Sequence, residues 1–139
     1  MDVFILRIAG VLQAWGTHTF EDSRPSALFP TRSGVAGLLG ACLGIDREDP
    51  GGLRAVSDGF AYCARLDRSR WPLVRIVDFQ TVEHARKVDG GVSENPVLSR
   101  RQYLCDAKFT VALSLKSSFP FAHDRLNSDF RGGLTVIEI

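Results

Sequence analysis

The sequence predicts an α+β fold, and three observations support this class. Four segments have the short, apolar pattern of β-strands, namely residues 2–10, 60–67, 71–82 and 108–115. Residues 31–44 instead carry apolar side chains at helical spacing. With 139 residues, 45% of them hydrophobic, the chain suits one domain with one core, and no repeat or linker divides it.

The first half of the chain is expected to hold one strand, a long loop and two helices. DVFILRIAG (2–10) is an apolar strand, and a loop with many turn residues follows it. The main helix starts at Thr31 or Ser33, either of which can cap it, and extends to about Gly44. A shorter helix is expected over 51–57, after the turn sequence DREDPGG.

The second half is expected to be mostly strand. FAYCARLD (60–67) alternates large and small side chains, WPLVRIVDFQTV (71–82) is a further strand, and KFTVALSL (108–115) is the clearest strand of all. Between the last two, EHARKVDGGVSENPVLSRRQYL (83–104) has a turn-rich middle and basic flanks.

The main helix contains an unusual number of glycines. On a helix, Gly37, Ala41 and Gly44 lie at i, i+4 and i+7 with Gly40 beside them, which makes one face nearly flat. Each interior glycine costs about 0.5–1 kcal/mol relative to alanine, so some contact must offset that cost. We interpret the flat face as a site of tight packing between the helix and the sheet.

The start of the same helix suggests a second possibility. PTRSG offers unpaired backbone N–H groups, the hydroxyls of Thr31 and Ser33, and the guanidinium of Arg32 at the positive end of the helix dipole. Such a terminus binds phosphate readily. The alternative is that the two hydroxyls only cap the helix.

Composition limits the classes of partner and compartment. A net charge of +1 excludes a generally cationic nucleic-acid-binding protein, although residues 61–116 hold ten Lys or Arg against six Asp or Glu. The longest apolar stretch is too short and too rich in glycine to span a bilayer, and residues 1–10 do not resemble a leader. The three cysteines, Cys42, Cys63 and Cys105, are expected to be buried thiols. These features favour a cytoplasmic protein without a membrane partner.

Catalytic and metal-binding patterns are missing from the sequence. His18, His84 and His123 are far apart, and no Cys, Asp or Glu spacing suggests a metal site. There is no phosphate-binding P-loop and no nucleophile elbow. We therefore expect no cofactor, no metal and no enzymatic activity.

Three blocks of sequence resemble the CRISPR-associated CasD family, the Cascade subunit of type I-E interference complexes. They are LQAWG (12–16), SRPSALFPTRSGVAGLLGACLGIDRED (23–49) and RQYLCDAKFTVALSL (101–115), and the match covers most of residues 3–115. The resemblance implies a ferredoxin-like, RNA-recognition-type core with an inserted β-hairpin thumb at about 83–104, all in one domain.

The same resemblance implies a function. Members of the type I-E family are structural subunits that cap the 5′ handle of the guide RNA and contact the adjacent backbone subunit. The expected partners are thus guide RNA, the backbone and large Cascade subunits, and target DNA only indirectly. A related type I-C subunit cleaves precursor guide RNA, so a metal-independent endoribonuclease, with a histidine and Tyr103 or Lys108 as acid and base, is the alternative. A free-standing RNA-recognition module is disfavoured, because FAYCARLD and KFTVALSL lack its paired aromatic residues.

Ten residues are candidates for RNA contact: Trp15, Arg24, Thr31, Arg32, Ser33, Arg86, Lys87, Arg100, Arg101 and Lys108. Trp15 could stack on a base, or could instead anchor the core or a neighbouring subunit. Arg24 and Arg32 are phosphate candidates or solvated surface residues. The basic pairs in 83–104 suit a thumb that clamps RNA, although a solvated hairpin would have the same composition. Tyr103 and Phe109 are expected in the core.

The tail, residues 117–139, departs from the family pattern. AHDRLNSDF could form a second helix and LTVIEI a closing strand, which would complete a split βαβ core. A truncated remnant or a naturally compact subunit are the alternatives.

Overall fold

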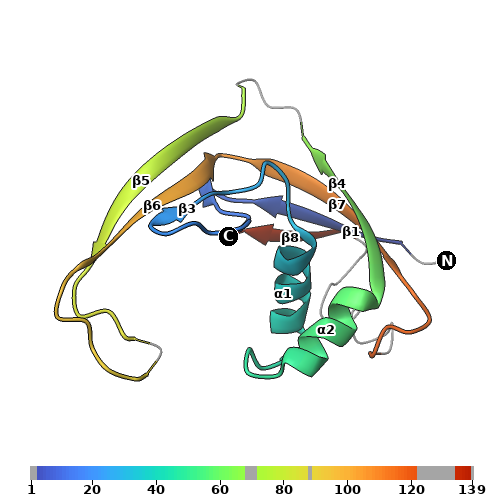
Figure 1. Cartoon of the computed structure of the whole chain (residues 1–139). Helices are drawn as coiled ribbons and strands as arrows, with labels where there is room; N and C mark the ends of the chain where they lie inside the picture. Colours follow the sequence, from blue (N-terminus) through green and yellow to red (C-terminus); the bar gives the residue numbers. More distant parts are fainter. Residues whose placement is uncertain (1–2, 68–71, 88, 122–133, 139) are drawn as a thin grey trace.

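The computed structural model describes residues 3–67, 72–87, 89–121 and 134–138, which form two sheets and two helices. Sheet A has the order β4-β7-β1-β8. Sheet B has the order β2-β6-β3, with β5 paired to β6. The bounds of the elements are β1 Val3–Ala9, β2 Leu12–Gln13, β3 Ser23–Arg24, α1 Arg32–Cys42, α2 Pro50–Asp58, β4 Phe60–Leu66, β5 Val74–Val82, β6 Val97–Cys105, β7 Lys108–Leu115 and β8 Leu134–Glu138. Figure 1 shows the helices beneath sheet A and the β5–β6 hairpin extending away from it.

Sheet A contains a split βαβ arrangement. Strand β7 is antiparallel to both β1 and β4, so β1 and β4 are parallel to each other on its two sides, with α1 and α2 in the connection between them. β8 confirms the expected strand in the tail and pairs with β1. β8 runs parallel to β1. If β7, a helix and β8 formed a second crossover unit, β8 would be parallel to β7 and therefore antiparallel to β1. The expected helix at 122–130 lies outside the described residues.

The core lies between the helices and sheet A. Alternate residues of β7, from Phe109 to Leu115, are buried and pack with buried residues of β1 and α1. The main members are Leu6, Ile8, Val35, Leu39, Val56, Phe60, Phe109, Val111 and Leu113. Each such side chain contributes about 1.5–3 kcal/mol by leaving water. Phe109 is therefore a core residue, as expected, while Tyr103 is only half-buried.

Local sequence signals explain both ends of α1. The Thr31 hydroxyl accepts a hydrogen bond from Gly34 N at 3.3 Å, which confirms Thr31 as the cap. At the other end, Gly44 adopts φ +70°, Gly44 N donates to Ala41 O, and Ile45 N donates to Gly40 O. This is the hydrogen-bond pattern of a Schellman motif, in which glycine is favoured.

The glycines of α1 differ from one another in their surroundings. A Cβ on Gly34 would lie 2.7 Å from the Trp15 ring, and one on Gly40 would lie 2.6 Å from Leu53 Cδ2 of α2. Apart from its chain neighbours and its own helix backbone, Gly37 has no heavy atom of the described residues within 4 Å of its Cβ position, and it is solvent-exposed. The expected flat face through Gly37 is therefore wrong as a packing surface for the sheet: the close contacts are made by Gly34 and Gly40, with side chains.

A long antiparallel hairpin covers most of residues 74–105. Its two strands are β5, as predicted within 71–82, and β6, which pair antiparallel from Val74↔Cys105 to Val82↔Val97. Residues 83–96 are the connection between them. β6 also pairs with β2 and β3 on its other edge, which fixes the base of the hairpin to the rest of the chain.

Two further expectations concern thiols and membrane segments. Cys42 and Cys63 are solvent-exposed and Cys105 is half-buried, so the prediction of buried thiols is wrong for the first two. Strand alternation explains Cys63, which points to the face of sheet A opposite the helices. Within the described ranges, no helix has the length and apolar content needed to cross a membrane.

Arg32 joins the two helices to sheet A. Its Nη1 donates to Ser57 O of α2 at 2.8 Å and to Phe60 O of β4 at 3.0 Å. Its guanidinium also lies 5.2 Å from the centroid of the Phe60 ring and 5.4 Å from that of Tyr62. Because Ser57 O is one of the last carbonyls of α2, this cation satisfies and stabilises the C-terminal end of that helix.

Gly34 and Gly37 provide a matched pair of alanine substitutions. Gly34→Ala should lower the free energy of unfolding by about 1–3 kcal/mol, because the new methyl group overlaps a buried indole ring. Gly37→Ala should raise it by about 0.4–1 kcal/mol, because the position is open and helical. Thermal or urea unfolding checks both. Equal effects of the two substitutions would contradict the contact between Gly34 and Trp15.

The Arg32 contacts predict a cost to stability. Arg32→Ala should lower the free energy of unfolding by about 1–2 kcal/mol, toward the low end for hydrogen bonds from a charged donor because the side chain is accessible to water. Arg54→Ala is the control, since Arg54 is exposed on α2 and forms a 3.8 Å ion pair with Asp58. A loss from Arg32→Ala no larger than that from Arg54→Ala in urea unfolding would refute the role of Arg32 as a clamp.

Candidate nucleic-acid interface

An open hollow of about 480 Å³ lies where the LQAWG segment meets the start of α1. Its lining therefore comes from two of the three sequence blocks that carry the family resemblance. The lining residues are Leu12, Gln13, Ala14, Trp15, Gly16, Thr31, Ser33, Gly34, Gly37 and Leu38. No acidic side chain is among them, and the glycines bring the helix backbone to the surface of the hollow.

Apart from Gln13, the polar side chains of this lining belong to the start of α1. The hydroxyls of Thr31 and Ser33 lie 3.3 Å apart. Within the described part of the chain, the N–H group of Ser33, which lines the hollow, has no hydrogen-bond acceptor. This N–H group, the hydroxyls and the positive end of the helix dipole together favour an anionic ligand.

Contacts with three neighbouring segments hold this helix start in place. Tyr62 Oη of β4 donates to Pro30 O at 3.2 Å, and Ala27 N donates to Trp15 O at 2.7 Å. On the opposite side of the turn, the Arg32 guanidinium hydrogen-bonds to Ser57 O of α2 and Phe60 O of β4. Arg32 is therefore directed away from the hollow and is not among its lining residues. The hollow is therefore a preformed feature of the fold.

Trp15 is a core residue. It is 5% exposed, its ring meets Phe109 edge-on at a centroid distance of 6.5 Å, and its Nε1 donates to Gln13 Oε1 at 3.3 Å. Both Trp15 and Gln13 are thus held in place, because Gln13 Nε2 donates in turn to Ala107 O. This burial favours the alternative that Trp15 anchors the core over base stacking.

The register of β5 and β6 sorts the hairpin side chains onto two faces. Directly paired residues share a face, and the face that contains the buried Leu104 is here called the core-side face. The core-side face consists of Arg75, Val77, Phe79, Thr81, Leu98, Arg100, Gln102 and Leu104. The far face consists of Val74, Ile76, Asp78, Gln80, Val82, Val97, Ser99, Arg101, Tyr103 and Cys105. Apolar side chains are exposed on both faces.

The candidate arginines divide between these two faces. Arg100 lies on the core-side face, where it forms an ion pair with Asp22 and stacks over the Phe79 ring. Arg101 lies on the far face opposite Asp78, and the pairing of β3 with β6 places Arg24 beside Arg101. Arg24 Nη1 donates to Glu21 O at 2.8 Å. The structure thus separates Arg100 from Arg24 and Arg101.

Arg86 and Lys87 lie in the connection at the tip of the hairpin, not on its arms. This connection is itself folded, because Lys87 N donates to Gly91 O, Ser93 N donates to Ala85 O, and Arg86 bridges to Val92. Gly90 adopts φ +83°, which explains the glycine at this turn. Both basic side chains are exposed.

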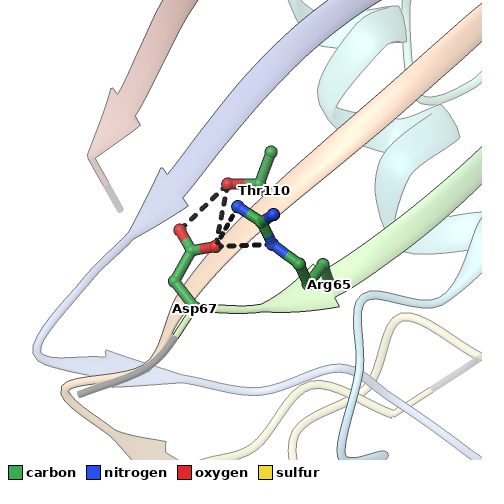
Figure 2. Close-up of polar contacts among 3 residues, drawn as sticks. All are labelled: Arg65, Asp67 and Thr110. Atoms are coloured by element: carbon green, nitrogen blue, oxygen red, sulfur yellow. Dashed lines mark hydrogen bonds and ion pairs between the residues drawn. The ribbon is translucent and has the colours of Figure 1, made fainter.

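Lys108 lies apart from the other candidates. It is exposed on β7 next to the buried Phe109, so alternation places it on the face of sheet A opposite the helices. The same face contains the group drawn in Figure 2, in which Asp67 accepts hydrogen bonds from Thr110 Oγ1 at 2.9 Å and from Arg65 Nη2 at 3.1 Å. Cross-strand pairing of Arg65 with Thr110 accounts for this group, which ties the end of β4 to β7.

The acid–base pair of the endoribonuclease alternative is not assembled among the described residues. Tyr103 Oη accepts a hydrogen bond from Gln80 Nε2 at 3.3 Å on the far face of the hairpin. Lys108 is on sheet A, His84 is in the hairpin connection with φ +54°, and neither His18 nor His84 hydrogen-bonds to Tyr103 or Lys108 there. His123 lies outside the described residues. In the same part of the chain, no three His, Cys, Asp or Glu side chains come together as a metal site would need.

Sequence reasoning missed two features of the candidate interface. Gly37 lines the hollow although its expected role was packing. Phe79 is 56% exposed on the core-side face of the hairpin, beside Arg100. The sequence WPLVRIVDFQTV could not show that Phe79 is exposed, because the odd-numbered and the even-numbered positions of this strand both contain large apolar side chains.

Comparisons with known proteins agree on one family. The family model described as CRISPR-associated protein (Cas_Cas5) matches residues 3–130. The "CRISPR system Cascade subunit CasD" of Escherichia coli (strain K12) is 49% identical over 117 residues, which are 80% of this chain and 52% of that protein. A chain of a solved "CRISPR RNA-guided surveillance complex" superposes with a TM-score of 0.67 at 33% identity, over 82% of this chain and 49% of the other. This chain thus spans about half the length of these relatives, and it belongs to the Cas5 family of CRISPR-associated proteins.

Proposed function

We propose that this chain is a non-catalytic subunit of a type I-E-like Cascade complex, which binds and caps the 5′ handle of the guide RNA. The observation that carries this proposal is the hollow, where LQAWG and the first turn of α1 meet around an unpaired N–H group and hydroxyls. The curated relative is by name a Cascade subunit, and the similar solved chain comes from an RNA-guided complex. The name of that complex supports RNA as the anion.

The hollow suits the sugar-phosphate backbone of a single strand. A phosphate at the start of α1 would accept hydrogen bonds from the N–H groups and hydroxyls of the first turn. Gly37, one turn further on, lets the next sugar approach the helix without meeting a side chain. An exposed interior glycine that costs about 0.5–1 kcal/mol is then explained by binding, not by packing.

We also propose that the core is ferredoxin-like and that the β5–β6 hairpin is its thumb. The order β4-β7-β1 and the split βαβ arrangement of sheet A support the first proposal, and the parallel pairing of β8 with β1 departs from that fold. The exposed basic residues at the hairpin tip support the second, with Arg86 and Lys87 in contact with phosphates. Apolar side chains on both hairpin faces suit additional contact with the adjacent backbone subunit and the large subunit, in a complex that works in the cytoplasm.

Filling the hollow without disturbing the fold tests the RNA site. Gly37→Gln should reduce affinity for single-stranded RNA at least tenfold, because the added side chain occupies the space proposed for the RNA backbone. Ala41→Gln is the matched control, since Ala41 is exposed one turn along the same helix but does not line the hollow. Fluorescence anisotropy gives the affinities, and melting curves verify that both variants are folded. Equal affinities for the two variants would refute RNA binding in the hollow.

Salt dependence tests the hairpin tip. For RNA binding, the plot of log Kobs against the logarithm of the salt concentration has a negative slope. Replacing both Arg86 and Lys87 by Gln should reduce the magnitude of this slope by about 1.4, since each lost phosphate contact on a single strand contributes about 0.7. The double variant Arg47→Gln/Arg54→Gln removes the same charge from exposed positions near and on α2 and should leave the slope unchanged. Identical slopes for both double variants would mean that the tip is a solvated loop.

A further inference from the structure

We propose that Phe79 is a stacking platform for an unpaired base of the RNA, with Arg100 and Asp22 as its support. This inference rests on the proposed function, because it places part of the same RNA on the core-side face of the hairpin. Base stacking on aromatic side chains is a general mode of single-strand recognition, and it tolerates every base because each has a π-face.

The ring of Phe79 is held on one side only. Arg100, its register partner on β6, places its guanidinium 5.6 Å from the ring centroid. Asp22 forms an ion pair with that guanidinium, which fixes its position beside the ring. Among the described residues, β5 pairs with no strand other than β6, so no strand covers the other side of Phe79. The side chain remains 56% exposed although it belongs to a regular strand.

The charges of the hairpin favour a nucleic acid as the occupant. On the core-side face, the strands contribute Arg75 and Arg100, and Asp22 pairs with Arg100, whereas Asp78 lies on the far face opposite Arg101. An exposed aromatic ring with a guanidinium beside it matches an unpaired base, which has a π-face of its own. The base of this face lies next to the hollow, because Leu104 pairs with Gln13, which lines the hollow.

Two probes separate base contact from phosphate contact. The first is a fluorescent single-stranded RNA of 12 uridines, and the second is the same oligomer with abasic riboses. Phe79→Ala in the full chain should weaken binding of oligouridine by about 5- to 100-fold and leave binding of the abasic oligomer unchanged. Phe79→Tyr should restore the affinity, because a tyrosine ring also stacks. Val77→Ala, on the same face and also exposed, should change neither affinity.

The outcomes distinguish this inference from the function on which it rests. Equal binding of oligouridine by Phe79→Ala and the parent, with Gly37→Gln still impaired, would overturn the platform and keep the hollow as the RNA site. Equal weakening of both probes by Phe79→Ala would also overturn it, because the effect would not depend on a base. Failure of the parent chain to bind either probe would overturn both the platform and the proposed RNA function.

Discussion

The indole of Trp15 lies between the first turn of α1 and Phe109 of β7, and the geometry of the candidate interface depends on this contact. Gly34 admits the ring to the helix backbone, while Gln13 fixes its Nε1. The contact holds the LQAWG segment at a set distance from the helix start and creates the hollow between them. A larger residue at 34 would displace the indole, the segment and the hollow together.

The hairpin exposes apolar side chains on both of its faces. A two-stranded ribbon is marginal on its own in water. Here β6 pairs with β2 and β3 at its base, and the chain continues from β6 into the central strand β7, where Leu104 and Phe109 are both buried. Between them Asp106 adopts φ +50°, which breaks the alternation so that an even-numbered and an odd-numbered residue reach the same core. The exposed part of the hairpin is thereby presented from a rigid base.

Much of the fold could be predicted because its signals are local. Caps and turn residues located both helices, and alternation located β4 and β7. Strand β6 was not predicted as a separate strand, because Arg100 and Arg101 interrupt any simple alternation and only pairing with β5 shows their different faces. The surroundings of Arg32 and Gly37 also depend on tertiary contacts that the sequence pattern does not show. The Arg32 guanidinium hydrogen-bonds to α2 and β4, and no side chain of the described residues lies over Gly37. The family itself could be identified from sequence, because its motifs are dense in blocks.

The hollow and the core-side face of the hairpin together form the surface that we propose for single-stranded RNA. Amide hydrogen exchange of the full chain, with and without the oligouridine probe, reports on both parts of this surface at once. When the RNA is bound, we expect slower exchange of the backbone amides in the first turn of α1 and along β5 and β6, and unchanged exchange in β4. Slowing confined to β4 and the sheet A face opposite the helices, or absent from both the helix start and the hairpin, would contradict a shared RNA surface.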